Sequence, residues 1–206
     1  RVFTLSTTDK FFLNNDLNHK YSTSYKENDF SKSKSYKMST LSLETNFKYL
    51  FSENVYHTFG LGYSLKDYKV TNDSTVSESI AKSSGASISF NISNDISLNN
   101  LNSFIRPTKG QYLSLGNYIE TPSSSSNGFI KNIITAKKYT EYKKNVYSIQ
   151  GRLGNIYSLN NNEILSDDKF SLGGRWLRGF DNFGAGPRNS RSAYVGGNNL
   201  VAAKLD

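Results

Sequence analysis

The chain has 206 residues, of which 14% are aromatic; it carries a formal net charge of +8 and contains no cysteine. The length suits one domain with a substantial core, and no apolar run approaches the roughly 20 residues of a membrane-spanning helix. A basic chain can bind nucleic acid, but here the lysines are scattered, with the nearest clusters at Lys137–Lys138 and Lys143–Lys144. We therefore predict no nucleic-acid partner.

Apolar and polar residues alternate with a period of two along the whole chain, which is typical of β-strands with one apolar face. In the clearest run, 55–66, Phe59 and Leu61 fall on one face, and Gly60 and Lys66 fall on the other. The same pattern puts Ile88 on an apolar face. The alternation predicts strands at 2–12, 17–27, 36–51, 54–67, 84–98, 110–121, 128–142, 145–158 and 196–206.

The lengths of the strands and of their connections favour a membrane barrel. Several predicted strands exceed the five or six residues usual in soluble domains and reach the roughly 9–11 that cross a bilayer. Short connections alternate with long ones, as in up-and-down outer-membrane barrels. The short connections are 13–16, 52–53 and 143–144, the intermediate ones 99–109 and 122–127, and the long ones 28–35, 68–83 and 159–195.

These features predict an all-β, antiparallel, up-and-down transmembrane β-barrel whose lipid face includes Phe59 and Ile88. A soluble β-sandwich or a small soluble barrel also alternates and is the alternative. Bacterial barrels usually have an even number of strands. Because about nine strands are predicted, we expect the chain to be a segment of a larger barrel.

Residue patterns typical of catalysis or metal binding are lacking. His19 and His57 both fall within strand patterns, and we interpret His57 as a ring at the membrane interface rather than a ligand. Asp167 and Asp168 adjoin the long loop, but adjacent residues of an extended chain point apart, so a catalytic pair is not expected. No metal-ligand spacing occurs. We predict no enzyme activity, no metal and no cofactor.

Two groups of residues form an ordered series of motifs. The first is a turn in which proline fixes φ and a glycine follows; its residues are Asn102, Pro107, Thr108 and Gly110. The second belongs to the long loop and consists of Gly173, Gly174, Leu177, Arg178, Gly179, Phe180, Gly186, Pro187 and Arg188. In this order and spacing the motifs resemble those of the BamA-type outer-membrane insertases, and more broadly of the superfamily that includes TamA and the two-partner-secretion transporters.

The resemblance implies that residues 1–206 are the central part of a C-terminal outer-membrane barrel, from about the fourth to the twelfth of about sixteen strands. Loop 159–195 would be its lid loop. The periplasmic repeats and the first and last strands would lie outside the chain. The implied function is insertion and folding of β-barrel proteins into the bacterial outer membrane without an energy source. The implied partners are unfolded barrel clients, outer-membrane lipid and accessory assembly lipoproteins.

Two other functions remain open, namely a secretion pore of the two-partner-secretion or TamA type, and a general porin with a chance motif. In the family, the lid loop enters the lumen and its arginine, here Arg178, pairs with acidic groups of the wall, which we expect on strands beyond Asp206. Gly179 would permit the turn at the tip, and Phe180 would pack on the wall. The family often has aspartate where Asn102 stands, so a role that needs that charge does not carry over.

Overall fold

A computed structural model describes residues 1–12, 17–31, 35–76, 78–122, 127–174, 176–181, 184–190 and 194–206 of the chain. The described part contains nine strands, and short helix α1 (Glu78–Lys82) precedes the fifth. The strands are β1 (Val2–Asp9), β2 (Leu17–Asp29), β3 (Tyr36–Ser52), β4 (Val55–Val70), β5 (Gly85–Asn99), β6 (Gly110–Glu120), β7 (Phe129–Tyr142), β8 (Asn145–Ser158) and β9 (Asn199–Leu205). None of the described helices is long and apolar enough to span a bilayer.

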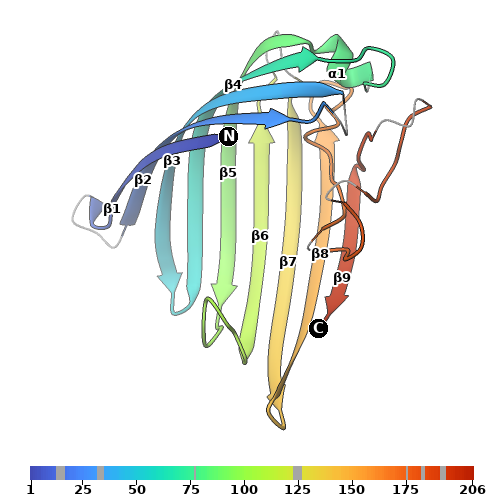
Figure 1. The fold of residues 1–206 in the computed structure, drawn as a ribbon. Coiled ribbons are helices and arrows are strands. Elements are labelled where there is room, and N and C mark those ends of the chain that lie inside the picture. The colour runs from blue at the N-terminus through green and yellow to red at the C-terminus, as the bar shows by residue number, and fades with distance from the viewer. Residues whose placement is uncertain are drawn as a thin grey trace.

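The nine strands form a single sheet in chain order, and each strand pairs antiparallel with its sequence neighbour. Figure 1 shows the sheet curling, so that β1 to β3 pass in front of β5 to β8. Within the described residues β1 and β9 are the two edges, so the sheet is open. The predicted up-and-down all-β fold is confirmed, and each predicted strand is found within a few residues of its expected bounds.

The strand bounds differ from the predicted ones by up to three residues, at the end of β4, which extends to Val70, and at the two edges of the sheet. The first strand, predicted over 2–12, ends at Asp9, and the last, predicted over 196–206, begins at Asn199. Gly197 instead forms an isolated bridge with Phe170 of the long loop. Its backbone is therefore bonded to the loop rather than to β8. Helix α1 was not predicted, because five residues are too few to display a helical period.

Short and long connections lie at opposite ends of the sheet. The 53–54, 100–109 and 143–144 connections share one end, which we call the turn end. Lys143 and Lys144 both have positive φ, 47° and 68°, as a two-residue hairpin requires. The 71–84, 121–128 and 159–198 connections lie at the other end, the loop end (Figure 1). The predicted short connection 13–16 lies outside the described residues.

The pleat gives the sheet two different faces. The loop-bearing face carries Lys66, Glu120 and Lys131, which contact one another or the long loop. The apolar face is exposed and carries, among others, Phe59 (37% exposed) and Ile88 (40% exposed). The two residues therefore share the face on which they were expected, and their contact with lipid stays a prediction.

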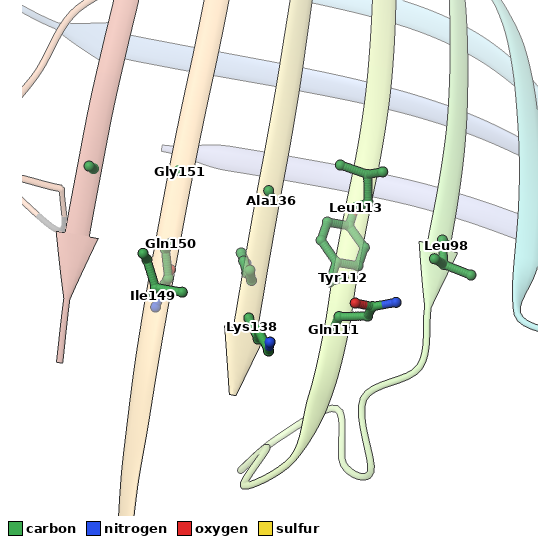
Figure 2. A pocket seen from close by; sticks show the side chains of 11 residues that line it. Leu98, Gln111, Tyr112, Leu113, Ala136, Lys138, Ile149, Gln150 and Gly151 are labelled. Atoms are coloured by element: carbon green, nitrogen blue, oxygen red, sulfur yellow. The ribbon is translucent and has the colours of Figure 1, made fainter. Parts of the chain in front are cut away.

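A shallow groove crosses the apolar face from β5 to β9 (Figure 2). Its volume is about 410 Å³. Small side chains form its floor, because the register aligns Ala136 with Gly151 and Gly151 with Ala203. Leu98 and Leu113, which pair across β5 and β6, continue the same row.

Candidate functional site

The long connection between β8 and β9, residues 159–198, packs onto the loop-bearing face, and we call it the lid loop. Its hydrophobic anchor is Phe170, 6% exposed. The cluster around it joins β7, β8, β9 and the lid loop and comprises Phe129, Ile156, Ile164, Phe170 and Leu200. The Lys131 ammonium lies 4.6 Å from the centroid of the Phe170 ring, a distance at which a cation is attracted to the ring face.

Gly154 of β8 provides the space for the Phe170 ring. A Cβ atom at position 154 would lie 2.6 Å from Phe170 Cζ and 2.8 Å from Cε1. Such distances are well inside van der Waals contact, so any larger residue at 154 would displace the ring. The glycine therefore forms a notch in the wall into which the loop fits.

Backbone hydrogen bonds hold Phe170 in that notch. Phe170 N donates to Gly197 O, and Gly197 N donates to Phe170 O, both at 2.9 Å. The Tyr194 hydroxyl, which is buried, donates to Phe170 O at 3.1 Å. Burial raises the pKa of the Tyr194 phenol above its ordinary value, so the donor stays protonated at neutral pH.

A second hydrophobic contact fixes the loop far from β8. Leu165 packs in a cluster with residues of β3, β4 and the 71–84 connection; its members are Tyr36, Tyr68, Val76, Ile80 and Leu165. Strands β3 and β4 are separated from β8 by β5 to β7 in the sheet order. The lid loop therefore bridges the interior of the curled sheet from one side to the other.

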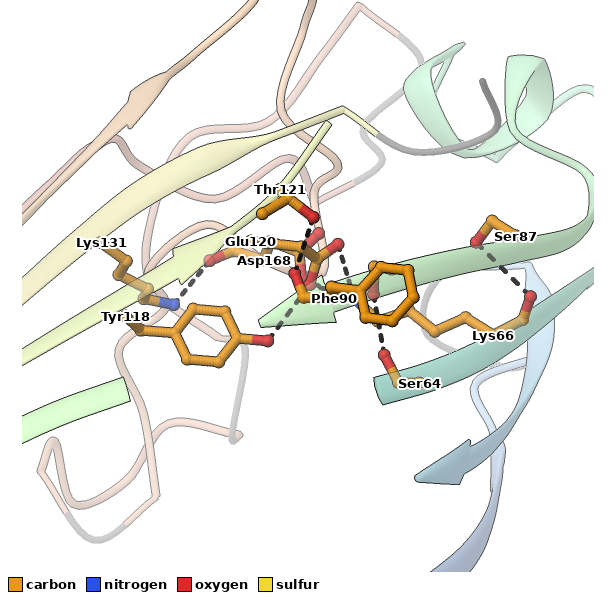
Figure 3. Close-up of polar contacts among 10 residues, drawn as sticks. Ser64, Lys66, Ser87, Phe90, Tyr118, Glu120, Thr121, Lys131 and Asp168 are labelled. Atoms are coloured by element: carbon orange, nitrogen blue, oxygen red, sulfur yellow. Dashed lines mark hydrogen bonds and ion pairs between the residues drawn. The ribbon is translucent and has the colours of Figure 1, made fainter. Parts of the chain in front are cut away.

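The polar part of the site is a buried set of charges where the lid loop meets the wall (Figure 3). Lys66 Nζ lies 3.1 Å from Glu120 Oε2 and 3.4 Å from Asp168 Oδ1. The three side chains are 15%, 3% and 16% exposed. Lys131 Nζ donates to the Asp168 carbonyl oxygen at 2.6 Å, and the Tyr118 hydroxyl donates to Glu120 Oε2 at 3.2 Å. We call Lys66, Glu120 and Asp168 the base triad.

Asp167 and Asp168 point to different partners. The Tyr36 hydroxyl donates to Asp167 Oδ1, whereas Asp168 binds Lys66. The two carboxylates therefore anchor the loop to β3 and β4. Sequence reasoning dismissed them as a catalytic pair and did not assign this anchoring role. The sequence feature that could have indicated this anchoring role is a charged residue on the polar side of each of two strands, Lys66 and Glu120.

The tip of the lid loop, residues 173–180, carries the predicted arginine. A tight turn closes it, because Gly174 N donates to Phe180 O at 2.9 Å and Phe180 N to Leu177 O at 3.3 Å. Arg178 Nη2 lies 3.1 Å from Asp206 Oδ1, and the two side chains are 78% and 32% exposed. An acidic partner of Arg178 is thus present inside the chain, on the residue that follows β9.

The other predicted residues of the tip lie as follows. Gly179 has φ of 86°, which glycine adopts without strain. Phe180, expected on the wall, is 51% exposed. Gly173 also has positive φ, 153°. The Arg152 guanidinium of β8 lies 5.5 Å from the Trp176 ring centroid and brings the tip close to the wall.

The Gly186-Pro187-Arg188 motif forms the returning arm of the loop. The backbones of Arg188 and Tyr194 form an isolated antiparallel β-bridge, and Val195 N donates to Pro187 O at 3.1 Å. A Cβ atom at Gly186 would lie 3.0 Å from the Tyr194 hydroxyl oxygen. The motif therefore packs against the tyrosine that holds Phe170, and it connects the tip to the anchor.

The turn motif lies at the turn end, remote from the lid loop, and Asn102 organises it. Asn102 Oδ1 accepts from Thr108 N at 3.0 Å and Lys109 N at 3.1 Å, and Asn102 Nδ2 donates to Thr108 Oγ1 at 2.8 Å. Gly110 follows Pro107 and enters β6 with φ of 104°, where a Cβ atom would lie 2.1 Å from Asn100 O. The amide closes the turn without a charge.

The structure thus separates the predicted site residues into two places and adds a third. The lid-loop motif forms the tip and returning arm, the turn motif closes the β5–β6 connection, and the base triad joins loop to wall. Among the residues that the structure describes, no group of three or more His, Asp or Glu side chains is placed to hold a metal ion. What this geometry can do is hold a long loop rigidly across the interior of a curled sheet.

Comparisons with known proteins agree with this architecture. The family model described as "Omp85 superfamily domain" matches residues 1–206. Among solved structures, the crystal structure of BamA from Haemophilus ducreyi lacking POTRA domains 1–3 superposes with a TM-score of 0.84 at 23% sequence identity. The match covers 99% of this chain and 44% of that chain. A comparison with curated proteins found no match.

The structural likeness supports the fold of a BamA-type barrel, and the open sheet is consistent with a segment of one. The family match covers the whole chain and places it in the bacterial outer membrane. This chain belongs to the Omp85 superfamily.

Proposed function

We propose that the chain is the central part of the barrel of an assembly factor that inserts and folds β-barrel proteins into the outer membrane. The observation that carries the proposal is the family match over residues 1–206 together with a lid loop anchored inside the sheet. The partners would be unfolded barrel clients, outer-membrane lipid and accessory assembly lipoproteins. The factor would act by binding and conformational change rather than as an enzyme.

In this proposal the lid loop is a structural latch. The base triad and the Leu165 cluster tie the loop to β3, β4 and β6, and the Phe170 notch ties it to β8. Pulling the loop away would separate Asp168 from Lys66 and would remove the carbonyl partner of Lys131, and breaking such buried charged contacts is unfavourable. The loop therefore resists changes in the curvature of the wall without consuming an energy source.

Arg178 is the second tie of the latch. Its contact with Asp206 connects the tip to the end of β9, whereas the base triad connects the loop to the opposite part of the sheet. Because the guanidinium is largely exposed, the tip can release while the base stays in place. We propose that the two ties have different strengths and that the tip is the part that moves during client assembly.

A secretion pore of the two-partner-secretion or TamA type is the second candidate, and membership of the same superfamily favours it equally. In a secretion pore the loop would gate a channel, so its displacement should admit solutes. The domains encoded before the barrel separate the two candidates: several periplasmic repeats favour the assembly factor, and two repeats favour secretion.

The decisive experiment uses Asp168→Asn in the full-length protein, expressed in a strain depleted of its own copy. We expect slower appearance of folded, heat-modifiable client barrels in the outer membrane, with the variant itself correctly inserted. Normal client folding, combined with loss of export of one large secreted protein, would contradict the assembly role and favour the pore. Lys37→Met, which removes an exposed pair with Asp29, serves as the matched control.

A further inference from the structure

A row of polar side chains crosses the apolar face, and it is unrelated to the lid loop. The register sets Asn94 opposite Asn117, Asn117 opposite Asn132, and Asn132 opposite Asn155. Asn94 Nδ2 donates to Asn117 Oδ1 at 3.2 Å, Asn117 Nδ2 to Asn132 Oδ1 at 2.6 Å, and Asn132 Nδ2 to Asn155 Oδ1 at 2.8 Å. His57 Nε2 lies 2.6 Å from Asn94 Oδ1. These five residues are the amide ladder.

The amide ladder lies within the apolar face. Its residues belong to β4 to β8, and every one is half-buried rather than enclosed. The neighbours on the same face of each strand are large and exposed: Ile92 (37%) and Ile96 (46%) beside Asn94, Leu115 (41%) beside Asn117, Ile134 (42%) beside Asn132, and Leu153 (51%) beside Asn155. Polar groups therefore follow one another across a surface that otherwise suits hydrocarbon.

The ladder leaves hydrogen-bonding capacity unused. A carboxamide has two N–H donors and an oxygen with two lone pairs. Asn117 accepts one bond from Asn94 and donates one to Asn132, and Asn132 continues in the same way. Among the described residues each keeps one donor and one lone pair, and such groups are unfavourable in hydrocarbon without a partner. A membrane component that both accepts and donates hydrogen bonds would satisfy these unused amide groups.

The ladder also climbs across the membrane-facing surface. His57 lies near Val55, where β4 begins at the turn end, whereas Asn155 lies near Ser158, where β8 stops at the loop end. Barrel strands tilt by about 40° and stand about 4.8 Å apart, so four steps across them from β4 to β8 rise roughly 12 Å of an apolar belt about 25 Å tall. The polar path therefore spans about half of the belt.

Space for an acyl chain lies beside this path. A single row of large side chains, Leu115, Ile134 and Leu153, separates the ladder from the groove over Ala136 and Gly151. Figure 2 shows Ala136 and Gly151 side by side on adjoining strands, with the bulkier Leu113 on the next strand. A polar headgroup on the ladder could thus be accompanied by a hydrocarbon chain in the groove.

We propose that the amide ladder is a track for phospholipid headgroups, along which a lipid exchanges between the two leaflets. The unused N–H groups would bind the phosphodiester oxygens, and the carboxamide oxygens would accept from headgroup donors. The ladder of amides is uncharged, which suits a zwitterionic headgroup that must leave each position again. Transfer is passive and forms no covalent bond.

The test reconstitutes the full-length protein into vesicles of phosphatidylcholine and phosphatidylethanolamine that carry a trace of fluorescent phosphatidylcholine in both leaflets. Albumin extracts the labelled lipid from the outer leaflet only, and it is too large to pass through a barrel lumen. With wild-type protein we expect the extractable fraction to grow beyond the outer-leaflet share. The variant Asn94→Leu/Asn117→Leu/Asn132→Leu should slow this growth on the order of tenfold.

The matched control is Ile92→Leu/Leu115→Ile/Ile134→Leu, which changes adjacent outward positions without changing polarity, and it should exchange lipid at the wild-type rate. Client folding in the same vesicles is measured separately, so the track and the assembly role can fail independently. If albumin extracts no more labelled lipid from vesicles with wild-type protein than from protein-free vesicles, the proposed track is wrong. Equal rates for wild type and the asparagine variant would also overturn it and leave the ladder a clamp between strands.

Discussion

The base and the tip of the lid loop are both held by ion pairs, but their surroundings differ. At the base, Lys66, Glu120 and Asp168 are 15%, 3% and 16% exposed. At the tip, Arg178 is 78% exposed and its partner Asp206 is 32% exposed. The base is also packed on hydrophobic clusters that reach β3 and β8, whereas half of Phe180 at the tip is exposed.

This difference separates a permanent anchor from a weak contact. Removing one member of a buried charge group costs about 3–5 kcal/mol, because its partners stay desolvated without compensation. An exposed pair is worth about 0–1 kcal/mol. The lid loop should therefore be held mainly at its base, even though the recognisable motif lies at its tip. The following changes test this ranking, from the largest expected effect to the smallest.

Lys66→Met should have the largest effect. The substitution leaves Glu120 and Asp168 facing each other near the wall without the ammonium that both contact. We expect a loss of about 3–5 kcal/mol in the free energy of unfolding, measured as the urea midpoint of the full-length protein in detergent. Lys37→Met, whose pair with Asp29 is 53% and 59% exposed, is the control and should change little. Equal midpoints for the two variants would show that the base triad contributes no more stability than an exposed ion pair.

Gly154→Val tests the hydrophobic half of the base. Because a Cβ atom there would lie 2.6 Å from Phe170 Cζ, the ring must leave its notch, at a cost of about 1–3 kcal/mol. Protease added to intact cells should then cleave the lid loop faster. Gly151→Val changes the opposite face of the same strand, where the nearest atom is Ala202 O at 4.0 Å, and should leave cleavage unchanged. Phe170→Ala combined with Gly154→Val should recover part of the lost stability; failure to do so would count against the notch.

The same comparison shows what the sequence could and could not predict. The strands were predictable because residues on the two faces of a half-buried strand alternate in the sequence, as at Phe59 and Gly60. The base was not, because its partners are remote in the chain: Lys66 meets Asp168, and Gly154 meets Phe170. The presence of a glycine or a lysine on a polar strand face does not indicate which distant loop residue it contacts. The amide ladder required the register, since asparagine at four separate strand positions forms no local pattern.

Tyr194→Phe should have an intermediate effect and a distinctive pH dependence. The change removes the hydrogen bond to Phe170 O and should cost about 1 kcal/mol at pH 8. Burial raises the pKa of the phenol in the folded state. Its contribution is therefore complete below the unfolded value of about 10 and is lost as the pH rises through the folded value. Urea midpoints of wild type and variant should converge above that pH; a constant difference would show that the hydroxyl does not act through this bond.

Arg178→Ala should have the smallest effect on stability, below about 1 kcal/mol, because the pair with Asp206 is exposed. Its heat-modifiability should stay close to that of wild type, while client assembly slows if the tip is the moving part of the latch. Asp206→Asn should reproduce the effect, since it removes the charge that Arg178 contacts. A loss of stability as large as that of Lys66→Met would place the main anchor at the tip and contradict the ranking. Unchanged heat-modifiability together with normal growth and client folding would show that Arg178 is no part of the latch.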